Sequence, residues 1–75
     1  MPYDADNWNE VDSSHIEAIG TRGSDLIVKF KTGQAYLYPD LALEYPMLHQ
    51  ADSIGGYFRK HIREESCRRL MRTEE

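Results

Sequence analysis

The sequence of 75 residues contains very little cysteine, which excludes one common way of stabilising a small domain. Cys67 is the single cysteine, so it cannot form a disulfide within the chain. The chain also has no apolar run near the roughly 20 residues that a membrane-spanning helix needs. Its start, Met-Pro-Tyr-Asp, has neither the basic nor the apolar region of a signal peptide. We therefore expect a cytoplasmic protein without a membrane segment.

Patterns that support catalysis or metal binding are also scarce. The three histidines show no HxH or HxxxH spacing that would place two metal ligands on one face. Ser13-Ser14 lies outside any GxSxG motif, and hydrogen bonding at the start of a strand is its expected role. Gly55-Gly56 is not followed by the Lys and Ser or Thr of a phosphate-binding loop. We expect a non-catalytic protein with no metal and no small-molecule cofactor.

Negative charge predominates in the chain, but it is unevenly distributed. Thirteen Asp and Glu against nine Lys and Arg give a net charge of −4, which repels polyanions at long range. Residues 1–57 hold nine acids and three bases, whereas residues 58–75 hold four acids and six bases. A nucleic acid or another polyanion would therefore approach the C-terminal segment.

The hydrophobic pattern predicts a single small domain of the α+β class. Three segments, 15–20, 25–31 and 34–39, have the composition of strands, and alternation is clearest in 25–31, where Leu26, Val28 and Phe30 share one face. We expect a three-stranded antiparallel sheet (β-β-β) followed by two C-terminal helices packed on one face. One apolar sheet face and two amphipathic helices can cover each other in this way.

Two C-terminal segments have helical spacing. Apolar residues recur every three to four positions from 41 to 51, and Pro46 is tolerated only in a first turn, so this helix should begin near Glu44 or Tyr45. Asp52-Ser53 is expected to cap the second helix. The apolar stripe of that helix comprises Phe58, Ile62, Ser66 and Leu70.

Five short blocks of residues follow one another along the chain. They are Val11-Asp12-Ser13-Ser14, then Ile16 to Gly20, then Val28-x-Phe30-x-x-Gly33-x-x-Tyr36-x-Tyr38, then Ala51-x-Ser53-x-Gly55-x-Tyr57-Phe58, and Ile62-Arg63. This series resembles the KTSC family, a small domain named for the C-terminus of some lysyl-tRNA synthetases that also occurs in stand-alone bacterial or phage-type proteins. The resemblance implies a small α+β domain for which RNA binding is the usual suggested role.

Composition and the resemblance together divide the chain. Residues 11–63 would form the KTSC-like domain, and residues 1–10 would be a flexible N-terminal arm with Tyr3 and Trp8 as its only anchors. Residues 64–75 extend beyond the usual length of the family, and we expect them to form a C-terminal helical extension and tail. Pro46 departs from the polar helix residue that relatives usually carry at this point.

The register of the 25–39 hairpin decides whether two tyrosines belong to a binding face or to the core. Tyr36 and Tyr38 are two positions apart, so they share one face of the sheet and could stack bases there. A two-residue turn at Thr32-Gly33 would place them on the outer face, where Lys29 and Lys31 would complete an aromatic and basic platform.

The alternative hairpin has a turn at Lys31-Thr32 with Gly33 in the left-handed conformation. Tyr36 and Tyr38 would then join Val28 and Leu26 in the core. Thr32 is β-branched and resists the positive φ that the first turn requires, which favours this second hairpin.

A group of basic residues follows Phe58. On a helix, Arg59 and Arg63 form one ridge, and Arg68 and Arg72 form another. Arginine binds phosphate or carboxylate in bidentate fashion, and the paired ridge suits either target. Glu64 and Glu65 interrupt the series, so a solvated face of mixed charge is the alternative.

Two function classes follow from these observations. The first is a non-catalytic module that binds RNA or another nucleic acid through the second helix and the sheet face. The second is a protein-binding regulator that docks on a larger host or phage enzyme complex. The candidate binding residues are Arg59, Lys60, Arg63, Lys29, Lys31, Tyr36, Tyr38, Arg68 and Arg69.

Overall fold

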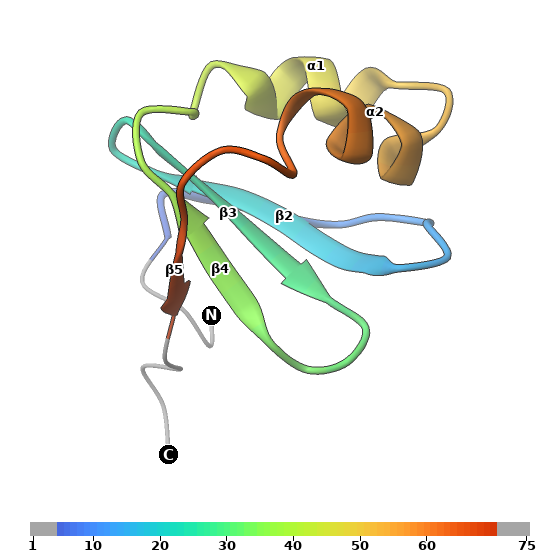
Figure 1. Cartoon of the computed structure of the whole chain (residues 1–75), viewed down its shortest axis with the longest axis horizontal. Coiled ribbons are helices and arrows are strands. Elements are labelled where there is room, and N and C mark those ends of the chain that lie inside the picture. Colours follow the sequence, from blue (N-terminus) through green and yellow to red (C-terminus); the bar gives the residue numbers. More distant parts are fainter. Residues whose placement is uncertain (1–4, 71–75) are drawn as a thin grey trace.

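Two helices cover one face of an antiparallel sheet in the computed structural model, which describes residues 5–70 (Figure 1). The elements are β1 (Asn7–Glu10), β2 (Ile16–Arg22), β3 (Asp25–Phe30), β4 (Ala35–Tyr38), α1 (Glu44–Gln50), α2 (Ile54–His61) and β5 (Arg68–Leu70). The strands lie in the order β1-β2-β3-β4-β5, so each pairs with its neighbours in the sequence. The α+β class and the two helices are confirmed. Neither helix of the described part has the length and apolar content to cross a membrane.

Both helices begin where local chemistry places them. Helix α1 begins at Glu44, so Pro46 lies in the first turn as expected. Ser53 is the N-cap of α2, and its hydroxyl oxygen accepts a hydrogen bond from the backbone N–H of Gly56 at 3.1 Å. The predicted cap is therefore confirmed.

The main core lies between the sheet and the helices. Its strand residues come mainly from β2 and β3, and the helical layer contributes Leu48 of α1 and Ile62, the residue that follows α2. Both of these side chains are completely buried. Each helix is thus held to the sheet by one fully buried aliphatic side chain, with partly buried aromatic residues around it.

The N-terminal edge of the sheet corrects the expectation of an arm over residues 1–10. Residues 7–10 form β1, which pairs with β2 from Asn7↔Thr21 to Glu10↔Ala18. Pairing gives hydrogen-bond partners to the open edge of β2, and Gly20 has no side chain to obstruct Trp8, the residue opposite it. Residues 1–4, with Tyr3, lie outside the described residues.

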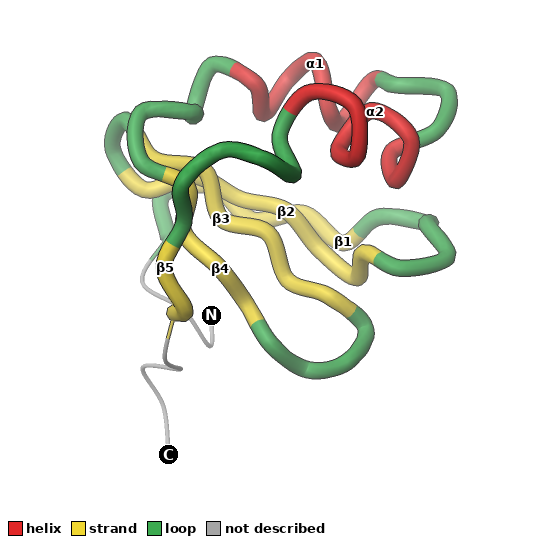
Figure 2. Tube along the Cα trace, viewed as in Figure 1, coloured by secondary structure: helices red, strands yellow, loops and turns green. Residues whose placement is uncertain are grey.

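The C-terminal edge corrects the expected helical extension over residues 64–75. Helix α2 ends at His61, and a loop leads to β5, which pairs with β4 (Figure 2). Leu70 therefore lies opposite Ala35 in the sheet and not on a helix stripe with Phe58. The open edge of β4 offers backbone partners that an extended helix could not use. The sheet consequently has five strands where three were expected, and residues 71–75 are outside the described part.

The sheet face opposite the helices is also apolar, although the predicted arrangement placed both helices on one face. Ala18, Ile27, Ala35 and Leu37 alternate with the residues of the main core, and each is at most 1% exposed. Trp8 and Leu70 lie on this same face, because they stand opposite Gly20 and Ala35. The central strands are therefore buried on both sides.

Gly20→Ala tests whether β1 is an integral strand. A Cβ atom at this position would clash with the backbone oxygen of Asn7 and would lie 2.8 Å from the ring of Trp8. Such overpacking should lower the free energy of unfolding by about 2 kcal/mol, measured by chemical denaturation. Gly55→Ala is the matched control, since its Cβ would meet only Ser13 Oγ at 3.5 Å. Unchanged stability in Gly20→Ala would mean that β1 does not pack on β2.

Asp40→Gly should stabilise the protein. Asp40 has φ 64°, a left-handed conformation that glycine adopts without steric cost. Its backbone N–H donates to Asp25 Oδ1 at 3.0 Å, and glycine retains this bond. We expect the free energy of unfolding, measured by thermal denaturation, to rise by about 1 kcal/mol. Gly23→Ala, at φ 59°, should change stability in the opposite direction. A lower free energy of unfolding in Asp40→Gly would show that the Asp40 side chain stabilises the fold by more than the backbone strain costs.

Candidate functional site

The register of β3 and β4 decides the position of the two tyrosines. Tyr36 lies opposite Val28 and Tyr38 opposite Leu26, on the helix side of the sheet. Gly33 has φ 99°, and the backbone N–H of Phe30 donates to the oxygen of Gln34 at 2.8 Å. The hairpin is thus the one with Gly33 in the left-handed region. The outer-face platform of tyrosines and lysines is wrong, because it required the other turn.

Neither tyrosine offers an open surface for stacking bases. Tyr38 is only 3% exposed and packs edge-to-face on Phe58, with ring centroids 5.8 Å apart. Burial raises the pKa of the Tyr38 phenol far above its usual value of 10, and Cys67 adds to this effect. Tyr36 is half-buried against Phe30, and its hydroxyl donates to Gln34 Oε1 at 2.7 Å.

The other basic candidates are spread over the molecule. Lys29 lies on the opposite sheet face, where its Nζ is 3.1 Å from Glu17 Oε2. Lys31 is exposed in the β3–β4 turn. Arg68 and Arg69 belong to β5 and face opposite sides of the sheet, so the second basic ridge expected on a helix does not exist. Arg72 lies outside the described residues.

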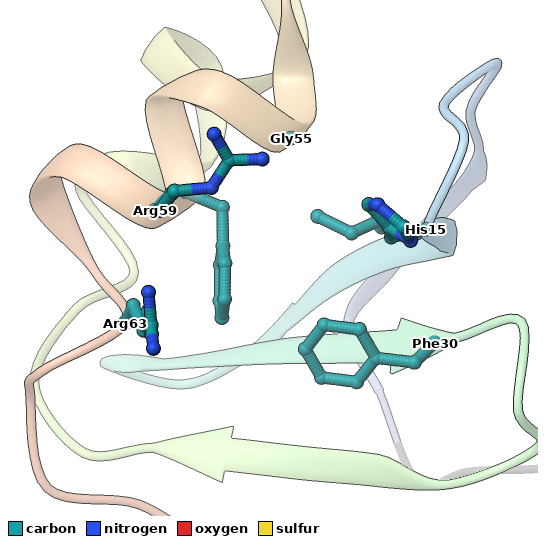
Figure 3. A pocket seen from close by; sticks show the side chains of 7 residues that line it. His15, Phe30, Gly55, Arg59 and Arg63 are labelled. Atoms are coloured by element: carbon teal, nitrogen blue, oxygen red, sulfur yellow. The ribbon is translucent and has the colours of Figure 1, made fainter.

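Arg59 and Arg63 do meet at one site. They border a cavity of about 250 Å³ between α2 and the adjoining ends of β2 and β3 (Figure 3). The remaining lining residues are His15, Ile16, Phe30, Gly55 and Phe58. Phe30 and Phe58 pack edge-to-face with their ring centroids 5.4 Å apart. We call this space the aromatic cavity, because two aromatic rings and two guanidinium groups define it.

The end of α2 explains why both arginines reach this cavity. Arg63 lies two residues after His61, the last residue of α2, yet its backbone N–H still donates to the oxygen of Phe58 at 2.9 Å. The buried side chain of Ile62 fixes the chain at this point. Within residues 5–70, the side chains of Arg59 and Arg63 form no hydrogen bond or ion pair. Arg63 therefore forms no ion pair with Asp12 or Asp52 of the described structure, and the guanidinium donors remain available.

A second, polar cavity of about 220 Å³ adjoins the first. It lies between residues 12–15, which lead into β2, and residues 52–56, which lead into α2. His15, Gly55 and Arg59 line both cavities. The polar cavity is otherwise lined by Asp12, Ser13, Ser14, Asp52, Ser53, Ile54 and Gly56.

The serines of the polar cavity also hold the local backbone. Ser13 Oγ lies 3.4 Å from the backbone nitrogens of both His15 and Ile16, which donate to it. This is the expected hydrogen bonding at the start of a strand, and Ser53 plays the equivalent part for α2. These bonds fix the two segments that form the walls of the cavity.

Comparison with known proteins identifies the family. A family model described as the KTSC domain matches residues 12–65. The chain belongs to the KTSC domain family. The match agrees with the resemblance seen over residues 11–63, and it contains every residue that lines the two cavities. No curated protein matches the chain.

The blocks that carry the KTSC resemblance converge at these cavities. Residues 12–14 and 52–56 belong to two of these blocks and are distant in sequence, but both line the polar cavity, and Arg63 borders the aromatic one. Sequence reasoning found Arg59 and Arg63 but missed His15, which we considered only as a metal ligand. It also treated Phe30 as core alone. The position of Phe30 at the last residue of β3, beside a turn, was the available signal.

The buried Tyr38 predicts a loss of stability at alkaline pH. Its pKa is higher in the folded protein than in the unfolded chain, so the folded state retains a proton that the unfolded state releases above pH 10. The free energy of unfolding should therefore fall as the pH rises above 10, and it should fall less steeply in Tyr38→Phe. Denaturation at a series of pH values measures both slopes. Equal slopes would show that Tyr38 ionises as easily in the folded protein as in the unfolded chain.

Proposed function

We propose that this KTSC chain is a non-catalytic RNA-binding module that holds a single-stranded segment beside α2. The proposal rests on the aromatic cavity. There the side chains of Arg59 and Arg63 have no hydrogen-bond or ion-pair partner among the described residues, and Phe30 and Phe58 lie beside them. Single-stranded RNA presents flat bases and phosphates together, and proteins bind it with aromatic rings and guanidinium groups. One base would lie against the two phenylalanines, and the two arginines would hold the flanking phosphates.

The size and charge of the site define the expected binding. A cavity of about 250 Å³ is smaller than the roughly 300 to 1,000 Å³ typical of drug-sized ligands, which suits a single base. The net charge of −4 opposes polyanions, so binding depends on local contacts and should be modest. Two phosphate contacts on a single strand predict a slope of about −1.4 for the logarithm of the binding constant against the logarithm of salt concentration.

The double variant Arg59→Ala plus Arg63→Ala tests this proposal. It should weaken binding of a fluorescent oligo(U) RNA at least tenfold in anisotropy titrations, and its salt slope should approach zero, because it removes both phosphate contacts. The melting temperature should stay unchanged, since both side chains are exposed and unpaired among residues 5–70.

Lys60→Ala provides the matched control. Lys60 is exposed on the same helix but lines neither cavity, so its loss should weaken binding less than twofold. An equal loss in Lys60→Ala would indicate that only the general charge of α2 matters. Full binding by the double arginine variant would overturn the proposal.

A protein-binding regulator is the second candidate, and one observation favours it. Leu43 is 88% exposed and Met47 is 58% exposed, and the two are four positions apart at the start of α1. Exposed apolar side chains of this kind commonly mark protein interfaces. A protein interface at this place should be nearly insensitive to salt and should persist after nuclease treatment, in contrast to RNA binding at α2.

A further inference from the structure

The aromatic and polar cavities share the wall formed by His15, Gly55 and Arg59. In Figure 3 the guanidinium group of Arg59 extends from α2 toward the side of the cavity where His15 lies. A nucleotide whose base occupies the aromatic cavity would therefore direct its sugar past this wall toward the polar cavity. The two cavities together accommodate more than a base.

The groups that line the polar cavity do not suit a phosphate. Asp12 and Asp52 are acidic residues that would repel a second anion, and Arg59 is the only Lys or Arg in the lining. The hydroxyl oxygens of Ser13 and Ser53 accept hydrogen bonds from backbone N–H groups. Their own O–H groups therefore remain free to donate a hydrogen bond to a ligand. The cavity thus combines carboxylate acceptors with hydroxyl donors.

A sugar hydroxyl matches this combination, because it both donates and accepts hydrogen bonds. Carboxylate side chains bind the 2′-hydroxyl of ribose in many nucleotide sites, and this hydroxyl is the group that distinguishes RNA from DNA. We infer that the polar cavity recognises the ribose 2′-hydroxyl, so that the KTSC chain prefers ribonucleotides to deoxyribonucleotides. This inference rests on the RNA-binding role proposed above.

The experiment compares two ligands that differ only in the 2′-hydroxyl. Anisotropy titrations with oligo(U) RNA and oligo(dU) DNA of equal length, at one ionic strength, give the ratio of their affinities. We expect the parent protein to prefer RNA by about threefold to tenfold, which corresponds to one or two net hydrogen bonds. In the double variant Asp12→Ala plus Asp52→Ala, which removes both carboxylate acceptors, the ratio should fall toward one, although both affinities should rise as acidic charge is lost.

The control is the double variant Glu64→Ala plus Glu65→Ala. It removes the same charge from exposed residues that line neither cavity, so both affinities should rise and the ratio should stay at the parent value. Equal binding of RNA and DNA by the parent protein would overturn the ribose inference while leaving nucleic-acid binding intact. A ratio that survives the aspartate changes would overturn it as well. Failure to bind either oligonucleotide would overturn the proposed function itself.

Discussion

The left-handed conformation of Gly33 sets the register on which the rest of the structure depends. With Gly33 at φ 99°, Phe30 stands opposite Gln34, and Val28 and Leu26 stand opposite the two tyrosines. A shift of one residue would turn every β4 side chain to the other face. The observed register places Phe30, Tyr36 and Tyr38 under the helices, where Phe58 packs against Phe30 and Tyr38. The same hairpin therefore builds both the core and one wall of the aromatic cavity.

The position of the basic side chains follows from this packing. Phe58 and Ile62 hold α2 and the residue after it against the sheet, so Arg59 and Arg63 border one cavity although the helix ends between them. Ser13 and Ser53 hold the two loops that face each other across the polar cavity. The two arginines and the polar groups of the loops are thus held in place, because each lies next to or near a residue that is packed in the core or hydrogen-bonded to the backbone.

The two edge strands explain how so short a chain buries its central strands on both faces. Strand β1 covers the edge of β2, and β5 covers the edge of β4. They also place Trp8 and Leu70 on the face away from the helices, which carries Ile27 and Leu37. Within the described residues, the exposed large hydrophobic side chains are Leu43 and Met47, so the apolar surface left for a protein partner lies at α1 and not on the sheet.

The sequence alone determined the elements whose signals are local. Alternation marked β3, the proline rule placed the start of α1 near Glu44 or Tyr45, and Ser53 marked the cap of α2. It also identified the KTSC family and the pair Arg59 and Arg63. Tertiary structure alone decided what depends on distant partners. Strands β1 and β5 exist because sheet edges offer them hydrogen bonds, and neither segment has an apolar alternation of its own. The polar cavity arises because two segments about 40 residues apart in the sequence meet at the start of α2, a proximity that no local pattern encodes.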